Sequence, residues 1–304
     1  MSAEKTARDW FTEGYRFDTV EGLSGRAIEA YRECIRLDDT FVDAYVNLGF
    51  IYLEREEYEM ALKCFARAAD LEPDNPEAYN NVGYVYEKME RLGSAVQMYE
   101  RAREVDPNDG EAYVNIAHIA DLQGDYQGAM SHYKKAVEIN PESAPAHFCL
   151  AVLYDRHDMF EEAMAAYQQV LNLDPRHTKA LFNMGNLHAQ HGAYEEALAC
   201  FKWVLKLNDT NADAYNNLGS VYEGMEKYED AVQMYKKSIS LKSAQEEAHY
   251  NLARLEYALA HEQPDESKRK EITDRLQFVL SMNSRNRKVQ QLLEKIEAST
   301  SADT

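Results

Sequence analysis

Two hydrophobic positions recur every 34 residues along most of this chain. Seven alanines lie in this register, and an aromatic residue follows each alanine four residues later. They are Ala27, Ala61, Ala95, Ala129, Ala163, Ala197 and Ala231, with Tyr31, Phe65, Tyr99, Tyr133, Tyr167, Phe201 and Tyr235. A spacing of four places both residues on one face of a helix. A fixed period of this length indicates stacked helical units, each burying its apolar face against its neighbours.

The block that begins at Val42 shows the pattern of one unit. Its marked positions are Tyr45, Leu48, Gly49, Tyr52, Tyr58, Ala61, Phe65, Ala68 and Pro73. This order resembles the tetratricopeptide repeat, a helix–turn–helix of 34 residues. The resemblance implies an all-α, right-handed superhelix (an α-solenoid) of about eight repeats with a C-terminal capping helix. In that family the first helices of the repeats line a concave groove.

The phase of the pattern predicts one solenoid over residues 1–298. The predicted repeats are 8–41 (degenerate), then 42–75, 76–109, 110–143, 144–177, 178–211 and 212–245, and an eighth at 246–286 with a longer loop near Pro264. A capping helix is predicted at 287–298 and a disordered tail at 299–304. Gly49 and its equivalents are expected where the two helices of a hairpin cross closely. Pro73 and its equivalents end each second helix, because proline lacks the helical N–H.

Asparagine recurs at the sixth position of the repeats, which in this family points into the groove. The six are Asn47, Asn81, Asn115, Asn183, Asn217 and Asn251, interrupted by Cys149. The ladder looks like the one inside O-linked N-acetylglucosamine transferase repeats. A carboxamide both donates and accepts hydrogen bonds, so it suits a peptide backbone. Two interpretations stay open: the ladder contacts a bound segment, or it joins neighbouring helices.

The residues at the other groove positions indicate the chemistry of the expected ligand. Ten acidic residues, among them Glu111, and four basic residues occupy them, and Glu87 and Asp121 are the acidic contacts that we favour. Tyr84, Phe148 and Phe182 are the expected apolar anchors. A basic or amphipathic protein segment, extended or helical, would suit this lining. The alternative is that the acidity only reflects the whole chain.

The composition narrows the classes of partner and compartment. The chain carries 53 acidic and 33 Lys or Arg residues, a formal charge of −20, which opposes binding to nucleic acid or anionic membranes. No apolar run has the length of a membrane span or a signal peptide. The four cysteines lie far apart and read as free thiols. We therefore expect a cytoplasmic protein.

No catalytic residue, metal site or cofactor is expected, because the sequence holds no nucleotide loop, nucleophile elbow or metal-ligand motif. His188 and His191 lie three residues apart but lack further ligands nearby. The sequence predicts a non-enzymatic scaffold or adaptor that binds partner segments in its groove. Two alternatives remain: a targeting or regulatory subunit of a separate enzyme such as a glycosyltransferase, and a self-assembling scaffold.

Overall fold

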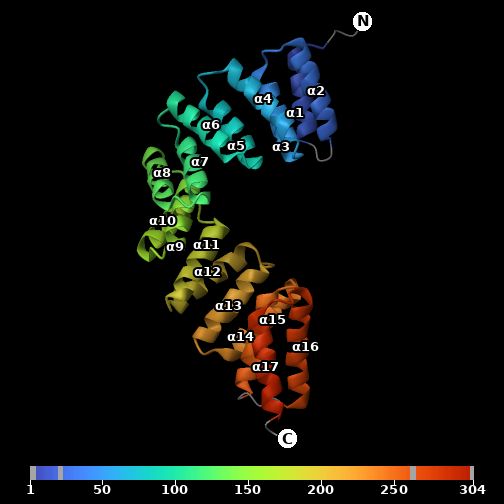
Figure 1. Ribbon diagram of the computed structural model, residues 1–304, viewed down its shortest axis with the longest axis vertical. Helices are drawn as coiled ribbons and strands as arrows, with labels where there is room; N and C mark the ends of the chain where they lie inside the picture. The colour runs from blue at the N-terminus through green and yellow to red at the C-terminus, as the bar shows by residue number, and fades with distance from the viewer. Residues whose placement is uncertain (1–4, 20–22, 261–264, 302–304) are drawn as a thin grey trace. The chain divides into compact units, whose positions relative to one another are not determined.

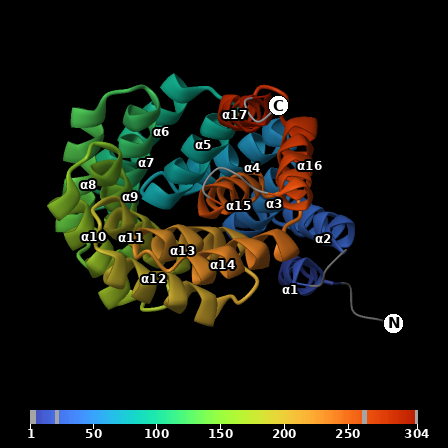
Figure 2. The same ribbon diagram turned by 90° about the horizontal axis from the view of Figure 1, so that it is seen from below.

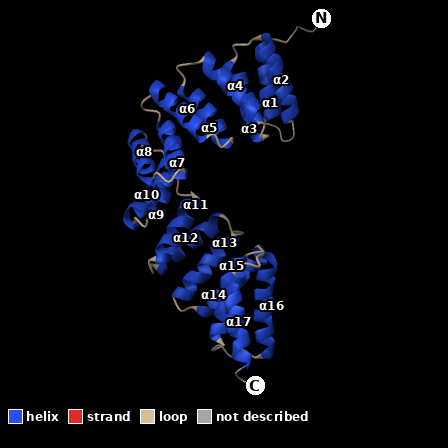
Figure 3. Ribbon diagram, viewed as in Figure 1, coloured by secondary structure: helices blue, strands red, loops and turns tan. Residues whose placement is uncertain are grey.

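The computed structural model describes residues 5–19, 23–260 and 265–301. Over these residues the chain forms seventeen α-helices and no strand (Figures 1 and 3). The predicted all-α repeat architecture is confirmed. The contacts divide the chain into two compact units, Met1–Leu153 and Tyr154–Thr304, with the boundary inside one helix. The prediction of a single solenoid domain stays a prediction.

The first unit holds four helical hairpins and most of a ninth helix. Its helices are α1 (Ala7–Asp18), α2 (Ser24–Leu37), α3 (Val42–Glu54), α4 (Tyr58–Leu71), α5 (Pro76–Lys88), α6 (Leu92–Val105), α7 (Gly110–Leu122), α8 (Tyr126–Ile139) and α9 (Ala144–Arg156). Within this unit α5 and α7 lie on the inner side of a curved row, and α6 and α8 lie on its outer side (Figure 2). The first helices of successive repeats therefore form one continuous face.

The second unit continues the same alternation. Its helices are α10 (Phe160–Leu173), α11 (Thr178–Gln190), α12 (Tyr194–Leu207), α13 (Ala212–Gly224), α14 (Tyr228–Leu241), α15 (Glu246–Leu259), α16 (Glu266–Met282) and α17 (Arg287–Ser301). Successive first helices touch directly, α11 with α13 and α13 with α15. We call the surface of the odd-numbered helices from α3 to α15 the first-helix face, and treat it separately in each unit.

The register residues form the core of each hairpin. All seven register alanines and the seven aromatics after them are at most 3% exposed. A Cβ added at Gly83 would lie 2.5 Å from the ring of Tyr99 in the same repeat, and one at Gly219 would lie 2.6 Å from Tyr235. The glycine therefore makes room for the aromatic ring, which refines the expectation that it only permits a close helix crossing. Burial of such a ring contributes about 2–3 kcal/mol.

The eighth repeat differs from the regular repeats in three places. Compared with the regular repeats, α15 is one residue longer, the connection to α16 is three residues longer, and α16 is three residues longer. The loop around Pro264 itself lies outside the described residues. The final helix reaches Ser301, whereas the sequence predicted an end at residue 298. Among the described residues, no helix has the length and apolarity that crossing a membrane requires.

Candidate functional site

The asparagine ladder of the first unit is only partly engaged by the protein. The Asn47 amide donates to the Tyr31 hydroxyl at 3.2 Å. Asn81 on α5 and Asn115 on α7 are half-buried, and no described residue hydrogen-bonds to either carboxamide. Two successive rungs in this unit therefore keep donor and acceptor capacity for something outside the chain.

In the second unit every ladder asparagine has a partner. The Asn183 amide donates to the Tyr167 hydroxyl at 3.1 Å. Asn251 donates to Asn216 at 3.1 Å, and Asn216 donates to Asn217 at 3.2 Å. Asn217 in turn donates to Asn186 at 2.6 Å. We call the chain formed by Asn251, Asn216, Asn217 and Asn186 the asparagine relay. It joins α15, α13 and α11, so here the ladder links neighbouring helices.

The register tyrosines reach the same face through their hydroxyl groups. Tyr99 donates to Glu87 at 3.2 Å, Tyr167 to Asp155 at 3.2 Å, and Tyr235 to Glu223 at 3.0 Å. Burial is the main cause that raises the pKa of each of these tyrosines. Burial likewise raises the pKa of Tyr31, which donates to Asp18, to about 12. The hydroxyls therefore stay protonated and act as fixed donors to the carboxylates.

The pairing of register tyrosines with carboxylates leaves a pattern in the sequence that was not used to predict it. Each of these four tyrosines has a carboxylate 12 or 13 residues before it. Where the register aromatic is Phe65 or Phe201, the residue 12 positions earlier is Leu53 or Ala189, which has no acceptor. The donor and its acceptor thus appear and disappear together from repeat to repeat. Several groove acids are therefore engaged inside the protein.

Two of these carboxylates also hold a base on the next first helix. Glu87 lies 3.2 Å from Nδ1 of His118, and Glu223 lies 2.7 Å from Arg254. The hydrogen bond to His118 lowers the pKa of Glu87, and the same bond raises the pKa of His118. Half-buried Asp121 lies close enough to His118 to raise the pKa of that ring as well.

The predicted apolar anchors lie on the first-helix face in both units. Tyr84 is 39% exposed, and the Lys88 ammonium lies 4.8 Å from its ring centre. Phe148 on α9 is half-buried. Phe182 on α11 is half-buried too and packs edge-on against Phe201 at 5.7 Å. Tyr84 is the most accessible of the three, and it lies one turn after Asn81 on the same helix.

An exposed tryptophan elsewhere has a structural explanation. Trp203 is 41% exposed, and its indole N–H donates to the Pro175 carbonyl at 3.2 Å. In other repeats a side chain at the fourth position meets the equivalent carbonyl, as Tyr79 does with Pro73 at 3.1 Å. The fourth position of this repeat is Leu181, which cannot donate. Trp203 replaces that donor, so its exposure does not mark a docking residue.

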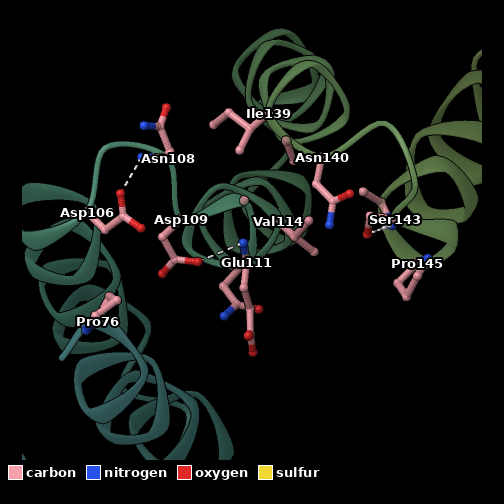
Figure 4. A pocket seen from close by; sticks show the side chains of 14 residues that line it. Pro76, Asp106, Asn108, Asp109, Glu111, Val114, Ile139, Asn140, Ser143 and Pro145 are labelled. Atoms are coloured by element: carbon pink, nitrogen blue, oxygen red, sulfur yellow. Dashed lines mark hydrogen bonds between the residues drawn. The ribbon is translucent and has the colours of Figure 1, made fainter.

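A hollow of about 790 Å³ opens beside Asn115 in the first unit. We call it the acidic hollow; it lies between the start of α7, the end of α8 and the start of α9 (Figure 4). Three carboxylates line it, and none of the described residues that line it is Lys, Arg or His. Asp109 caps α7 through the Glu111 N–H at 3.0 Å and also accepts from Asn80 at 2.7 Å. Asp106 accepts from the Asn108 N–H at 2.9 Å.

Glu111 is the carboxylate in this hollow that the protein leaves unpaired. No described residue donates a hydrogen bond to its carboxylate or forms an ion pair with it. Glu111 is exposed, but the protein around its carboxyl group still desolvates it and raises its pKa, and the nearby Asp109 and Glu77 raise it further. A cation placed in the hollow would relieve that repulsion. The sequence had placed Glu111 in the acidic groove but did not reveal the hollow, since α8 and α9 form its other wall.

Within the described residues no group of three His, Cys, Asp or Glu side chains is arranged to hold a metal ion. His191, the C-cap residue of α11, lies against the Leu187 carbonyl oxygen and the Phe160 ring. All four cysteines are free thiols, and burial raises the pKa of each one.

Sequence comparisons identify the repeat. Profiles described as tetratricopeptide repeat match residues 40–108, 74–142, 122–176 and 212–243, and one described as TPR repeat matches 188–226. Together these matches cover 40–176 and 188–243, more than half of the chain. No curated protein matches the sequence. The matches do not single out the glycosyltransferase repeats.

Solved structures agree on the fold. YrrB, described as a TPR protein with an unusual peptide-binding site, is 24% identical, with a TM-score of 0.54 over 62% of this chain and 96% of that one. PilF of Pseudomonas aeruginosa is 19% identical, with a TM-score of 0.62 over 71% and 98%. The Cut9–Hcn1 structure of the APC/C matches at 17% identity and a TM-score of 0.61, over 95% of this chain and 54% of that one. At these identities the likeness shows the fold alone.

Proposed function

This chain belongs to the tetratricopeptide repeat family, and on that basis we propose that it is a non-enzymatic scaffold that binds an extended protein segment on the first-helix face of its first unit. The family generally mediates protein–protein interactions. The observation that carries the proposal is the pair of unpartnered carboxamides, Asn81 and Asn115, on adjacent first helices. In the second unit, by contrast, the same residue type at the same position is satisfied internally.

The spacing of the two asparagines suits a peptide backbone. Adjacent helices pack about 8–10 Å apart, and an extended chain advances about 3.3 Å per residue. Asn81 and Asn115 would therefore meet peptide units about three residues apart. Each carboxamide can accept from a backbone N–H and donate to a C=O, which gives affinity without selecting a side chain. The likeness of the ladder to glycosyltransferase repeats enters only here, as the proposed mode of binding.

The surroundings favour a segment that joins an apolar residue to a basic one. Tyr84 offers an accessible ring next to Asn81. Glu111 offers an unpaired carboxylate, in a hollow that Asn115 also lines. Desolvation and the nearby carboxylates raise the pKa of Glu111, and a Lys or Arg of the partner would offset both by favouring the charged carboxylate. We therefore propose the same partner chemistry that the sequence predicted, and attach it to particular groups of one unit.

Selection from a phage-displayed library of random 12-residue peptides, followed by fluorescence polarisation with the best peptide, tests this proposal. The Asn81→Ala/Asn115→Ala variant should bind at least about tenfold more weakly, because two hydrogen bonds of about 1 kcal/mol each are lost. Glu111→Gln should weaken binding and reduce its dependence on salt. Selected peptides should be rich in Lys or Arg next to an apolar residue.

Asn47→Ala is the matched control. Asn47 occupies the same ladder position in the same unit, but its amide is already bonded to Tyr31. Its replacement should leave the dissociation constant within about twofold, once circular dichroism shows that the variant is folded. Equal loss of affinity in both variants, or no loss in either, would contradict the proposal.

A further inference from the structure

The charge of one ion pair on the first-helix face of the first unit depends on a single proton. Nδ1 of His118 on α7 lies 3.2 Å from Glu87 on α5. The His118 side chain is 46% exposed and the Glu87 side chain only 14%, so the imidazole is open to solvent and the carboxylate is largely not. Histidine is the side chain whose charge ordinarily changes near neutral pH. The net charge of this pair therefore depends on the pH around the protein.

The second unit contains the same pair with a permanent cation. Glu223 occupies the position in its repeat that Glu87 has, and Arg254 occupies the position of His118. One guanidinium nitrogen of Arg254 donates to both carboxylate oxygens of Glu223 at 2.7 Å. A guanidinium keeps its charge at any physiological pH, whereas an imidazole does not. The fold therefore builds this pair twice, and only the first-unit copy can lose its cation to a change of pH.

The His118–Glu87 pair lies next to the residues proposed to bind the partner. Tyr84 comes one turn before Glu87 on α5, and Asn115 comes one turn before His118 on α7. A segment that contacts Tyr84 and Asn115 therefore passes beside the pair. While His118 is charged, it cancels the charge of Glu87 and repels a basic side chain of that segment. Loss of its proton adds one negative charge to the place where a basic side chain is expected.

Charged groups on α5 and α7 set the pH range of this change. The hydrogen bond to Glu87 is the main cause that raises the pKa of His118, and the charge of Asp121 on α7 raises it as well. Partial burial and the Lys88 ammonium on α5 lower it, but the net shift is upward from the ordinary value of about 6.5. The neighbouring helices add titratable side chains that are uncharged near neutral pH: Tyr99 on α6, which donates to Glu87, and near Asp121 the side chains of Tyr133 on α8 and Cys149 on α9.

We propose that protonation of His118 regulates the first unit, so that a basic segment binds weakly while His118 is charged and tightly once it is neutral. This inference rests on the function proposed above and adds a control by pH to the same site. The effect is reciprocal: a bound basic segment should lower the pKa of His118, because its charge disfavours the imidazolium.

The test measures the affinity of the full chain for a basic peptide as a function of pH. The probe is the best library-selected peptide that contains Lys or Arg but no His, Asp or Glu, with both ends blocked and a dye that does not respond to pH. Its affinity for the wild type should rise about threefold to tenfold between about pH 5.5 and pH 8.5. A version of the peptide with Gln in place of its Lys and Arg residues should show a much smaller change.

Two substitutions of His118 fix the two charge states. His118→Gln keeps a hydrogen-bond donor for Glu87 without a charge, and should bind the probe tightly at both ends of the pH range. His118→Arg copies Arg254 of the second unit and should bind it weakly at both ends. Glu111→Gln should bind more weakly but keep the pH dependence of the wild type, which separates His118 from the other group of this face whose pKa is raised.

Three results would overturn the inference while the proposed function stands: a flat pH profile of the wild type, a wild-type slope that persists in either His118 variant, or equal affinities of the two variants. These results count for a probe whose binding needs Asn81 and Asn115. If no selected peptide needs those two asparagines, the proposed function itself fails, and this inference fails with it.

Discussion

The two units carry the same asparagine ladder and use it differently. In the second unit the amides of Asn217 and Asn251 belong to the asparagine relay between neighbouring first helices. In the first unit Asn81 and Asn115 have no partner among the described residues. Identical residues at identical repeat positions thus serve cohesion in one unit and remain available in the other. Repeat position alone does not tell which role an asparagine has.

The difference follows from the residues that surround each rung. Asn47 and Asn183 each meet a tyrosine hydroxyl 16 residues earlier. For Asn81 the residue at that position is Phe65, whose ring offers no hydroxyl. For Asn115 it is Tyr99, whose hydroxyl donates to Glu87, so this position explains the unpartnered carboxamide of Asn81 but not that of Asn115. The partners in the relay come from still further away, since Asn251 bonds to a residue 35 positions before it. A donor or acceptor that is already hydrogen-bonded inside the protein stabilises the fold but cannot bind a ligand at the same time.

Breaking the asparagine relay should cause the largest loss of stability. Asn216 is 3% exposed, accepts from Asn251 and donates to Asn217. Asn216→Ala should lower the free energy of unfolding by about 2 kcal/mol, because buried polar groups on both sides lose their partner. Urea unfolding measures this change. Asn115→Ala is the comparison and should cost less than about 0.5 kcal/mol. Equal costs would remove the distinction between the units.

Removal of the hydroxyl group of a register tyrosine should cause the next largest loss of stability. Tyr167 bridges Asp155 and Asn183, whereas Tyr99 donates to Glu87, which His118 also holds. Tyr167→Phe should therefore lower the free energy of unfolding by about 1–2 kcal/mol. Tyr99→Phe should cost less, since Glu87 keeps its second partner. The opposite order in urea unfolding would show that the hydroxyl contacts do not set these energies.

Giving Asn81 a tyrosine partner, like the one that Asn183 has in the second unit, should weaken peptide binding to the first unit. Phe65→Tyr would place a hydroxyl where Tyr31 and Tyr167 meet Asn47 and Asn183. Asn81 would then be engaged, and affinity for a peptide bound to the first unit should fall about threefold to tenfold. The matched control is Phe201→Tyr in the second unit, which should leave that affinity unchanged. Fluorescence polarisation compares the two, and equal behaviour would argue against a ligand role for Asn81.

The smallest expected effect is a pH dependence confined to the first unit. The bond to Glu87 raises the pKa of His118. The pair therefore contributes its full stability below the ordinary histidine pKa of about 6.5, and this contribution is lost as the pH rises through the raised value. The melting temperature should fall less between pH 6 and pH 8 in His118→Gln than in the wild type. His132, His188 and His249, whose pKa values burial lowers, are unchanged in both proteins. Parallel pH profiles would exclude the pair as their cause.

Much of the fold could be predicted because its pattern is local and repeated. The register of Ala95 and Tyr99 with its equivalents located the second helices, and Pro73 and its equivalents follow the end of α4 and its counterparts. The C-terminal repeat was less predictable. Its seven extra residues are shared among α15, α16 and their connection, since a helix extends as far as packing and side-chain contacts allow. There Lys268 and Arg275 of α16 hold the buried Glu256 of α15.

The candidate site could be predicted only in part. Counting from the register found Asn81 and Asn115, and the acids Glu87 and Glu111. It did not show that Glu87 is engaged by Tyr99 and His118 while Glu111 is unpaired. The co-occurrence of register tyrosines with carboxylates would have revealed the first of these pairings. The second needed the structure, because the walls of the acidic hollow come from three different helices.

The sequence by itself determined the repeat, its phase and the face on which the asparagines lie. Those properties depend on residues three, four and 34 positions apart, whose relation a helical repeat makes periodic. Only the tertiary structure decided which asparagines lack a partner among the described residues, which carboxylates are neutralised and where the acidic hollow opens. Each of these depends on side chains that meet across neighbouring helices, where a single change such as Phe65 for a tyrosine removes a partner without disturbing the register.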